Sequence, residues 1–265
     1  MMKLPRSEAT APSLEVLVEA DSTNDVLVAG AAALGDFSVV VTDNQTAGRG
    51  RLGRVWVAPP GKCLAISVLL RPVFSAGEPL PIEHFGWLPL LAGVAMARAV
   101  AAVAPERVGL KWPNDVQIDG LKVSGLLAEL LPTGDGVVLG AGVNLSLGAS
   151  ELPTPVATSL VLSGAQLAGD ELADAVLSTY LTALRELYAD FLRYGADPDA
   201  SGIRDAVVDT CVTLGQQVRV ELPGGDDLIG AAIGIDRTGR LQVRRSTDGQ
   251  VTAVAAGDVT HLRYE

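Results

Sequence analysis

The segment Gln45–Trp56 combines positive charge with glycine, because Arg49, Arg51 and Arg54 lie within six residues and each directly follows a glycine. Glycine lets the backbone come close to a ligand, and arginine presents a planar fork of donors that fits phosphate or carboxylate. A solvated hairpin tip is the alternative, but it rarely needs so many glycines beside guanidinium groups. The spacing therefore favours a site for an anion.

Three further polar clusters lie at the ends of predicted elements: residues 22–24, Lys111 to Asp115, and Lys122. With the arginine segment they supply hydroxyl and amide groups, guanidinium groups, two lysines and a carboxylate. This set suits the joining of two anions, since a carboxylate that attacks the α-phosphate of a nucleotide is repelled unless cations stand where charge develops. Mg²⁺, held by Asp115 or by the phosphates alone, would stabilise the pyrophosphate leaving group.

The composition is that of an acidic globular protein with one cationic spot. The chain has 265 residues, 48% of them hydrophobic, and a net charge of −11. Its length allows a substantial core and a small second domain. The negative charge opposes non-specific attraction to nucleic acid or to an anionic membrane, so we expect neither as a partner. The cationic spot suits one small anion better than a polyanion.

Several classes of protein are disfavoured. The two cysteines, Cys63 and Cys211, show no metal-binding spacing, and we expect both to be reduced in a cytoplasmic protein. The first thirteen residues lack the apolar region of a signal peptide, and the most apolar stretch, 87–104, contains both a proline and an arginine. With two histidines and no nucleophile-elbow pattern, a serine hydrolase has little support.

The polar clusters must be positioned by a sheet and its connecting helices. Ser22 and Asp25 match a capping box, so a helix should begin there and run to Leu34, although capping alone would account for the pair. The Asp119-Gly120 dipeptide predicts a hairpin turn before Lys122. Further strands are predicted at 14–20, 37–42, 63–71, 108–112 and 137–145, and helices at 86–104 and 170–194.

Two glycines in the strand 137–145, Gly140 and Gly142, lack the third glycine of a dinucleotide-binding fingerprint and are followed by prolines. We interpret them as places where another group packs against bare backbone. The helix 170–194 places its apolar residues on one face at helical spacing, which indicates a core helix. From about Thr213 five short strands separated by turns predict a small barrel, so we expect domains at 1–212 and 213–265.

Five blocks together resemble the signature blocks of biotin protein ligases: Gly48–Trp56 (GRGRLGRVW), Lys111–Asp115 (KWPND), Lys122–Glu129 (KVSGLLAE), Asp21–Asn24 (DSTN) and Gly140–Asn144 (GAGVN). Their order and spacing hold over nearly the whole chain. The resemblance implies an α+β fold: a catalytic domain with a mixed β-sheet and packed helices, like that of class II aminoacyl-tRNA synthetases, followed by a small SH3-like β-barrel.

The resemblance also implies a reaction and its residues. Biotin and MgATP would give biotinyl-5′-AMP and pyrophosphate, and the acyl group would pass to a lysine of a biotin carboxyl carrier domain. Lys122 and Arg51 would be catalytic, and Asp115 would be a candidate ligand of Mg²⁺. Biotin would contact Ser22, Thr23, Asn24, Gln45, Gly48, Arg49, Gly50, Arg51, Lys122, Gly125 and Gly140. ATP would contact Arg51, Arg54, Trp56, Lys111, Asn114, Asp115, Asn144 and Arg263.

Alternatives and limits follow from the same residues. A lipoate protein ligase would share the fold and the adenylation chemistry, and a ligand-binding module without catalysis would not need Lys122. Because thirteen residues precede Leu14, we expect no DNA-binding domain and no repressor role. A monomer or a homodimer is compatible with the sequence. The glycines of the arginine segment predict a loop that becomes ordered over a reactive acyl-adenylate and shields it from water.

Overall fold

The computed structural model describes residues 2–11, 13–56, 58–104, 106–222, 227–255 and 257–262. The α-helices are α1 (Pro5–Thr10), α2 (Thr23–Gly30), α3 (Leu88–Ala101), α4 (Gly169–Arg193) and α5 (Ile203–Thr210), and the 3₁₀ turns are η1 (Arg51–Gly53), η2 (Ile82–Trp87) and η3 (Ala149–Glu151). The strands are β1 (Leu14–Val16), β2 (Ser38–Thr42), β3 (Gly48–Arg49), β4 (Val55–Trp56), β5 (Cys63–Leu70), β6 (Val108–Lys111), β7 (Asp115–Ile118), β8 (Leu121–Leu130), β9 (Val137–Asn144), β10 (Gln217–Glu221), β11 (Asp227–Ile235), β12 (Leu241–Arg245), β13 (Val251–Val254) and β14 (Asp258–His261).

A seven-stranded mixed sheet forms the centre of the molecule, in the order β1-β2-β5-β9-β8-β7-β6. Strands β1 and β2 are parallel, and the remaining neighbours are antiparallel. Strands β5 and β9 lie side by side along their whole length, and both are almost entirely buried. A strand buried on both faces tolerates few polar residues, which is why these two segments are apolar in sequence.

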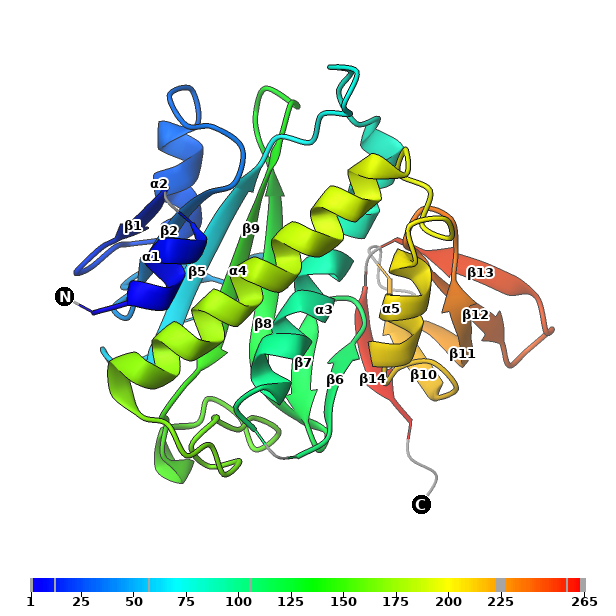
Figure 1. Ribbon diagram of the computed structural model, residues 1–265. Coiled ribbons are helices and arrows are strands. Elements are labelled where there is room, and N and C mark those ends of the chain that lie inside the picture. Colours follow the sequence, from blue (N-terminus) through cyan, green and yellow to red (C-terminus); the bar gives the residue numbers. More distant parts are fainter. Residues whose placement is uncertain are drawn as a thin grey trace.

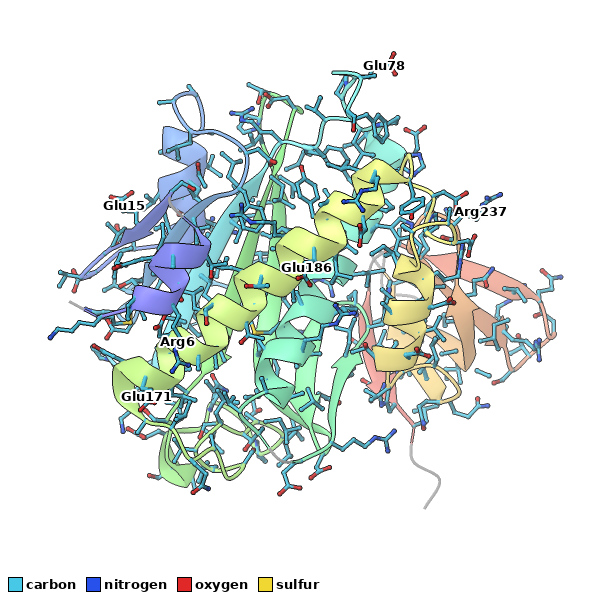
Figure 2. All side chains as sticks on the ribbon, in the orientation of Figure 1. Arg6, Glu15, Glu78, Glu171, Glu186 and Arg237 are labelled. Carbon is cyan, nitrogen blue, oxygen red and sulfur yellow. The ribbon has the colours of Figure 1, made fainter. Side chains whose placement is uncertain are left out.

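One face of this sheet is covered by α3 and α4, and α4 runs diagonally across it in Figure 1. The predicted apolar stripe of α4, which includes Leu172, Tyr180 and Phe191, is buried as expected. Glu171 and Glu186 of this helix are exposed and point outward in Figure 2, whereas Asp174 is buried and bonds Ser7 of α1. The other face is covered in part by α2, whose Leu27 packs with apolar residues of β2, β5 and β9. The uncovered part of that face is where a ligand can bind.

Residues 217–261 form a second, five-stranded antiparallel sheet in the order β13-β12-β11-β10-β14. The five short strands predicted there are confirmed. This sheet lies beside α3 and α5 in Figure 1, and the Trp87 indole donates a hydrogen bond of 2.9 Å to the Arg237 carbonyl. Gly86 and Gly239 let the two backbones meet, because a Cβ on Gly86 would lie 2.5 Å from the Thr238 carbonyl oxygen. The α+β fold class with a mixed sheet is confirmed. The domain limits 1–212 and 213–265 stay a prediction.

Some elements differ from those expected. Helix α2 ends at Gly30. The chain continues in turns whose hydrogen bonds span three residues instead of four, such as the bond of 3.0 Å from the Ala33 amide to the Gly30 carbonyl. Helix α3 begins at Leu88 because Pro89, which lacks a donor, occupies its first turn, and a 3₁₀ turn precedes it. The short helices α1 and α5 were not predicted.

The segment Ile82–Ala101 is long and apolar enough to cross a membrane by length and composition, but 67% of its most apolar window is buried within the fold. It is a core helix. Both cysteines are free and buried, and burial raises the pKa of the Cys63 thiol to about 12.

Candidate active site

A cavity of about 300 Å³ opens on the sheet face that α2 leaves uncovered. Its floor consists of residues with small side chains on adjacent strands: Ala65 of β5, Gly140 and Gly142 of β9, and Gly125 of β8. Ala65 is the cross-strand partner of Gly142, and Gly142 is the cross-strand partner of Gly125, so these three small residues lie side by side across β5, β9 and β8. Small side chains on neighbouring strands leave free space above a sheet, and this free space is the cavity.

Two wall side chains pack directly against glycine backbone. A Cβ on Gly140 would lie 2.4 Å from Asn24 Oδ1, and a Cβ on Gly142 would lie 2.7 Å from the Trp56 ring. Contacts this short are impossible for a real side chain. The structure therefore agrees with the interpretation that both glycines admit another group against the backbone.

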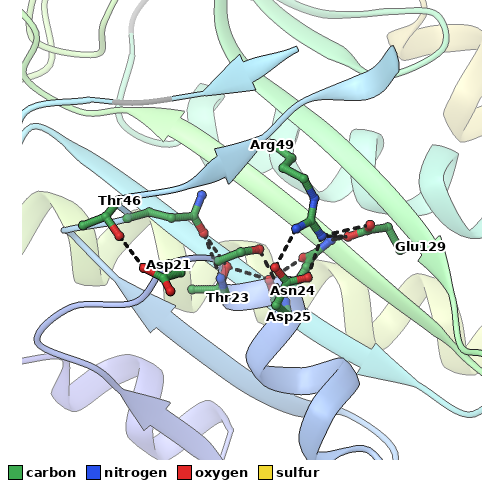
Figure 3. Close-up of polar contacts among 10 residues, drawn as sticks. Asp21, Thr23, Asn24, Asp25, Thr46, Arg49 and Glu129 are labelled. Atoms are coloured by element: carbon green, nitrogen blue, oxygen red, sulfur yellow. Dashed lines mark hydrogen bonds and ion pairs between the residues drawn. The ribbon is translucent and has the colours of Figure 1, made fainter. Parts of the chain in front are cut away.

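The first wall is the N-terminus of α2 (Figure 3). Ser22 is the N-cap residue, and its hydroxyl accepts a hydrogen bond of 3.4 Å from the Asp25 amide. Gln45 Oε1 accepts hydrogen bonds from the Thr23 amide at 2.8 Å and from the Thr23 hydroxyl at 3.2 Å. A helix N-terminus presents backbone donors, so this wall combines amide and hydroxyl groups suited to a polar, uncharged group.

Ser67 supports this wall, and sequence reasoning missed it. Its hydroxyl lies 2.7 Å from the Thr23 hydroxyl and 2.6 Å from Asn24 Oδ1, and the residue is fully buried. The available signal was weak: Ser67 is the one hydroxyl-bearing residue in the strand CLAISVLL. A buried hydroxyl needs partners, and here the wall residues provide them.

The arginine segment forms a small hairpin over the cavity, in which β3 pairs with β4 around the 3₁₀ turn η1. Arg49 forms a two-pronged ion pair with Asp25, with N–O distances of 2.5 and 2.6 Å, and also reaches Glu129 at 3.2 Å. The hydrogen bond from Arg49 holds the pKa of the Asp25 carboxyl below its usual range. Asp25 and Glu129 were not among the predicted site residues.

Arg51 extends in a different direction from Arg49. Its Nη1 donates to Asn114 Oδ1 at 3.1 Å and to the Gly257 carbonyl at 3.3 Å, so it links the hairpin to the 111–115 segment and to the second sheet. Asn114 in turn donates from Nδ2 to the Leu126 carbonyl at 2.9 Å. Arg54 and Trp56 complete the hairpin side of the cavity.

Lys122 and Asp115 form the opposite side, with Lys122 Nζ 2.7 Å from Asp115 Oδ1. Gly125 makes room for this pair, because a Cβ there would lie 3.0 Å from Lys122 Nζ. Asn144 is buried, and it donates a hydrogen bond of 2.8 Å to the Thr158 carbonyl, which supports the end of β9.

The structure brings together most of the predicted site residues but not all. The cavity lining contains Ser22, Thr23, Asn24, Gln45, Arg49, Gly50, Arg51, Arg54, Trp56, Asn114, Asp115, Lys122, Gly125, Gly140 and Asn144.

Two predicted residues lie outside the cavity lining, and a third lies outside the described residues. Among the described residues that line the cavity, Gly48 and Lys111 are missing. Gly48 stands behind the wall, since a Cβ there would lie 2.3 Å from Gln45 Nε2. Lys111 is the cross-strand partner of Asp115 and so shares its sheet face. Arg263 lies outside the described residues.

Comparisons with known proteins show the family of the chain that forms this cavity. Residues 16–144 match the biotin/lipoate A/B protein ligase family, and residues 213–262 match the biotin protein ligase C-terminal domain. The chain is 40% identical over 257 residues to a biotin--[acetyl-CoA-carboxylase] ligase of Mycobacterium tuberculosis, covering 94% of this chain and 89% of that protein. The chain belongs to the biotin protein ligase family.

A further relative and a solved structure support this family membership. A biotin--[acetyl-CoA-carboxylase] ligase of Paracoccus denitrificans is 32% identical, with 91% of this chain and 98% of that protein covered. Among solved structures, a biotin protein ligase from Aquifex aeolicus in complex with biotin and ATP superposes with a TM-score of 0.72 at 27% identity, covering 95% of this chain and 99% of that chain.

The residues of this biotin protein ligase fit a magnesium ion only in part. No group of three or more potential metal-ligating side chains occurs among the residues that the structure describes. Asp115 offers one carboxylate, which is paired with Lys122. Mg²⁺ in nucleotide sites is commonly held by one or two carboxylates together with substrate phosphates, so Asp115 could provide a single ligand.

Proposed function

We propose that this ligase joins biotin to ATP in the cavity above β5, β8 and β9, and then transfers biotin to a lysine of the carrier domain of a biotin-dependent carboxylase. One observation carries the proposal: a single cavity has an uncharged polar wall at the start of α2 and a cationic side formed by Lys122 and the arginine hairpin. The names of the relatives, which are biotin--[acetyl-CoA-carboxylase] ligases, support the same reaction.

The uncharged wall would hold the polar ring system of biotin. Thr23 and Gln45 are joined by hydrogen bonds, and Asn24 is held beside them by Ser67, so the wall offers hydroxyl and amide groups. The Asn24 amide can make four hydrogen bonds, and two of them are formed with described residues, Glu129 and Ser67, so this part of the chain leaves two for a ligand. The small floor residues would admit the biotin chain toward Lys122.

The cationic side would hold the reacting groups. In the first step a biotin carboxylate oxygen attacks the α-phosphorus of ATP, and the bond to pyrophosphate breaks. Lys122 and Arg51 would place positive charge at the carboxylate and the α-phosphate, which lowers the repulsion between them. Arg54, Trp56, Asn114 and Asn144 would position the nucleotide, with Lys111 and Arg263 as outer contributors.

In the second step the neutral amine of the acceptor lysine attacks the acyl carbon of biotinyl-5′-AMP. The bond to the phosphate oxygen breaks, AMP leaves, and the amine loses a proton. Before the carrier arrives the mixed anhydride must be kept from water, and the Gly48–Trp56 hairpin lies where it could cover the intermediate. Bound Mg²⁺ would neutralise charge on the departing pyrophosphate, with Asp115 as its protein ligand.

Several further properties belong to the proposal. Residues 1–212 would form the catalytic domain and residues 213–265 an SH3-like domain that contacts it through Arg51 and Gly257. The protein would act in the cytoplasm as a monomer or homodimer, without nucleic acid or membrane as partner and without a repressor role.

The test is incubation of the purified chain with labelled biotin, MgATP and a purified carrier domain. We expect ATP-dependent covalent label on one carrier lysine. Equal incorporation of lipoate would favour a lipoate ligase, because only the head-group contacts distinguish the two acids. Biotin binding without adenylate or transfer would favour a binding module, and either result would overturn the proposal.

A further inference from the structure

Three charged side chains from separate elements meet beside the cavity. Asp25 lies in the first turn of α2, Arg49 in β3 and Glu129 near the end of β8 (Figure 3). Their separations in the chain are 24 residues for Arg49 and Asp25 and 80 residues for Arg49 and Glu129. The cluster therefore ties the arginine hairpin to both the wall and the floor of the site.

The charges of this cluster do not favour binding of a further anion by Arg49. Both terminal nitrogens of the guanidinium are engaged, Nη1 and Nη2 by Asp25 and Nη2 also by Glu129. Two carboxylates against one guanidinium leave a net negative cluster. The positive charge at a bound carboxylate or phosphate must then come from other residues, such as Lys122 and Arg51.

Glu129 has a second partner on the wall. Its Oε2 accepts a hydrogen bond of 2.5 Å from Asn24 Nδ2, while Asn24 Oδ1 is held by Ser67 at 2.6 Å. These two bonds fix the orientation of the Asn24 amide, with Nδ2 toward Glu129 and Oδ1 toward Ser67. The same amide packs against the backbone of Gly140, where a Cβ would lie 2.4 Å from Asn24 Oδ1. One carboxylate thus orients a wall side chain and anchors a hairpin side chain.

We propose that Asp25 and Glu129 are positioning residues that hold Arg49, and with it the hairpin, closed over the acyl-adenylate. Asp25 acts on the hairpin through Arg49 and has no bond to Asn24 among the described residues, whereas Glu129 acts on both the hairpin and Asn24. The proposal rests on the proposed function. Arg49 serves as an anchor between elements, and its guanidinium does not bind the anionic intermediate.

The two carboxylates should differ in what they control. Asp25→Asn removes the two-pronged ion pair, and we expect release of biotinyl-5′-AMP to accelerate about threefold, with little change in the dissociation constant of biotin. Glu129→Gln keeps an oxygen that accepts from Asn24 and should behave like Asp25→Asn. Glu129→Leu removes both contacts, so release should accelerate and the dissociation constant of biotin should rise about tenfold.

The decisive experiment is a double-mutant cycle on the release rate, measured by chasing labelled biotinyl-5′-AMP from the enzyme with unlabelled compound. If Asp25 acts through Arg49, the Asp25→Asn/Arg49→Gln double variant releases the adenylate no faster than Arg49→Gln alone. Additive effects of the two changes would overturn the proposal, as would a wild-type release rate in Asp25→Asn.

The matched control is Asp190→Asn, which removes an exposed ion pair with Arg193 on α4, across the sheet from the cavity. It should leave release unchanged, and an equal acceleration there would count against a specific anchor. The biotin-dependent ATP–pyrophosphate exchange of the unmodified chain is measured first. Absence of that exchange contradicts the proposed function, whereas normal exchange with unaltered release in the variants contradicts the anchor alone.

Discussion

The Lys122 ammonium lies 2.7 Å from the Asp115 carboxylate at the edge of the cavity. The lysine backbone is held from both sides, because Lys122 is paired with Gln117 of β7 and its amide donates to the Val156 carbonyl at 2.8 Å. These backbone contacts fix the position of the Lys122 Cα atom, from which the side chain extends. A substrate anion can replace or share Asp115 as the partner of the ammonium, since 44% of the lysine side chain is exposed.

Lys122→Ala should abolish adenylate formation, because the charge needed at the reacting carboxylate and phosphate is lost. Biotin-dependent ATP–pyrophosphate exchange measures this step directly, and we expect a loss of at least about a hundredfold. Lys62→Ala is the matched control, since Lys62 is another partly exposed lysine in an ion pair, 3.7 Å from Glu151. Normal exchange in Lys122→Ala would exclude the assigned role.

Arg51→Gly should loosen retention of the intermediate, because it removes the contacts of the hairpin with Asn114 and Gly257. Escaped adenylate acylates any nearby amine, so we expect label on lysines of bystander proteins to rise about tenfold. Arg193→Gly, which truncates an exposed arginine at the end of α4, is the control. Strict carrier specificity in Arg51→Gly would show that the hairpin does not retain the intermediate through this residue.

Gly140→Ala should weaken biotin binding by displacing Asn24, since the new methyl group would lie 2.4 Å from Asn24 Oδ1. We expect the dissociation constant of biotin, measured by calorimetry, to rise about tenfold or more and the free energy of unfolding to fall by about 1–3 kcal/mol. Gly35→Ala is the control, because nothing lies within 4 Å of a Cβ at that position. Unchanged affinity in Gly140→Ala would mean that Asn24 does not contact biotin.

The buried Cys63 thiol should be unreactive in the folded protein and should link stability to alkaline pH. Burial raises its pKa from 9.0 to about 12, so above about pH 9 the unfolded chain loses a proton that the folded chain keeps. The free energy of unfolding should therefore decline between about pH 9 and pH 12, and less steeply in Cys63→Ala. Rapid labelling by a thiol reagent at pH 8 without unfolding would contradict the burial.

The sequence was sufficient to predict features that depend on local pattern. The apolar face of α4, the hairpin at Asp119-Gly120 and the five strands after Thr213 follow from spacing and turn chemistry, and the structure contains them. The polar clusters could be identified as groups because glycine, arginine and lysine at the ends of strands are visible without a fold, and most of their residues line one cavity. Short helices such as α1 and α5 were missed because they depend on docking, as when Ser7 of α1 bonds Asp174 of α4.

What the sequence could not predict is the partner of each side chain. Arg49 and Arg51 are two residues apart and look equivalent, yet one is held by Asp25 and Glu129 and the other by Asn114 and Gly257. Those partners lie on α2, on β8, in the 111–115 segment and next to β14, and they are brought near only by the packing of these elements. Ser67 was missed for the same reason, since its role depends on α2 lying above β5.

The most direct measurement is the identity of the small molecule retained by the chain after incubation with biotin, MgATP and pyrophosphatase, without a carrier domain. Gel filtration followed by mass spectrometry of the denatured protein fraction would report it. We predict close to one biotinyl-5′-AMP per chain, held in the cavity above β5, β8 and β9. Recovery of unreacted biotin and ATP, or of no ligand, would contradict the central claim that one cavity activates biotin and keeps the product.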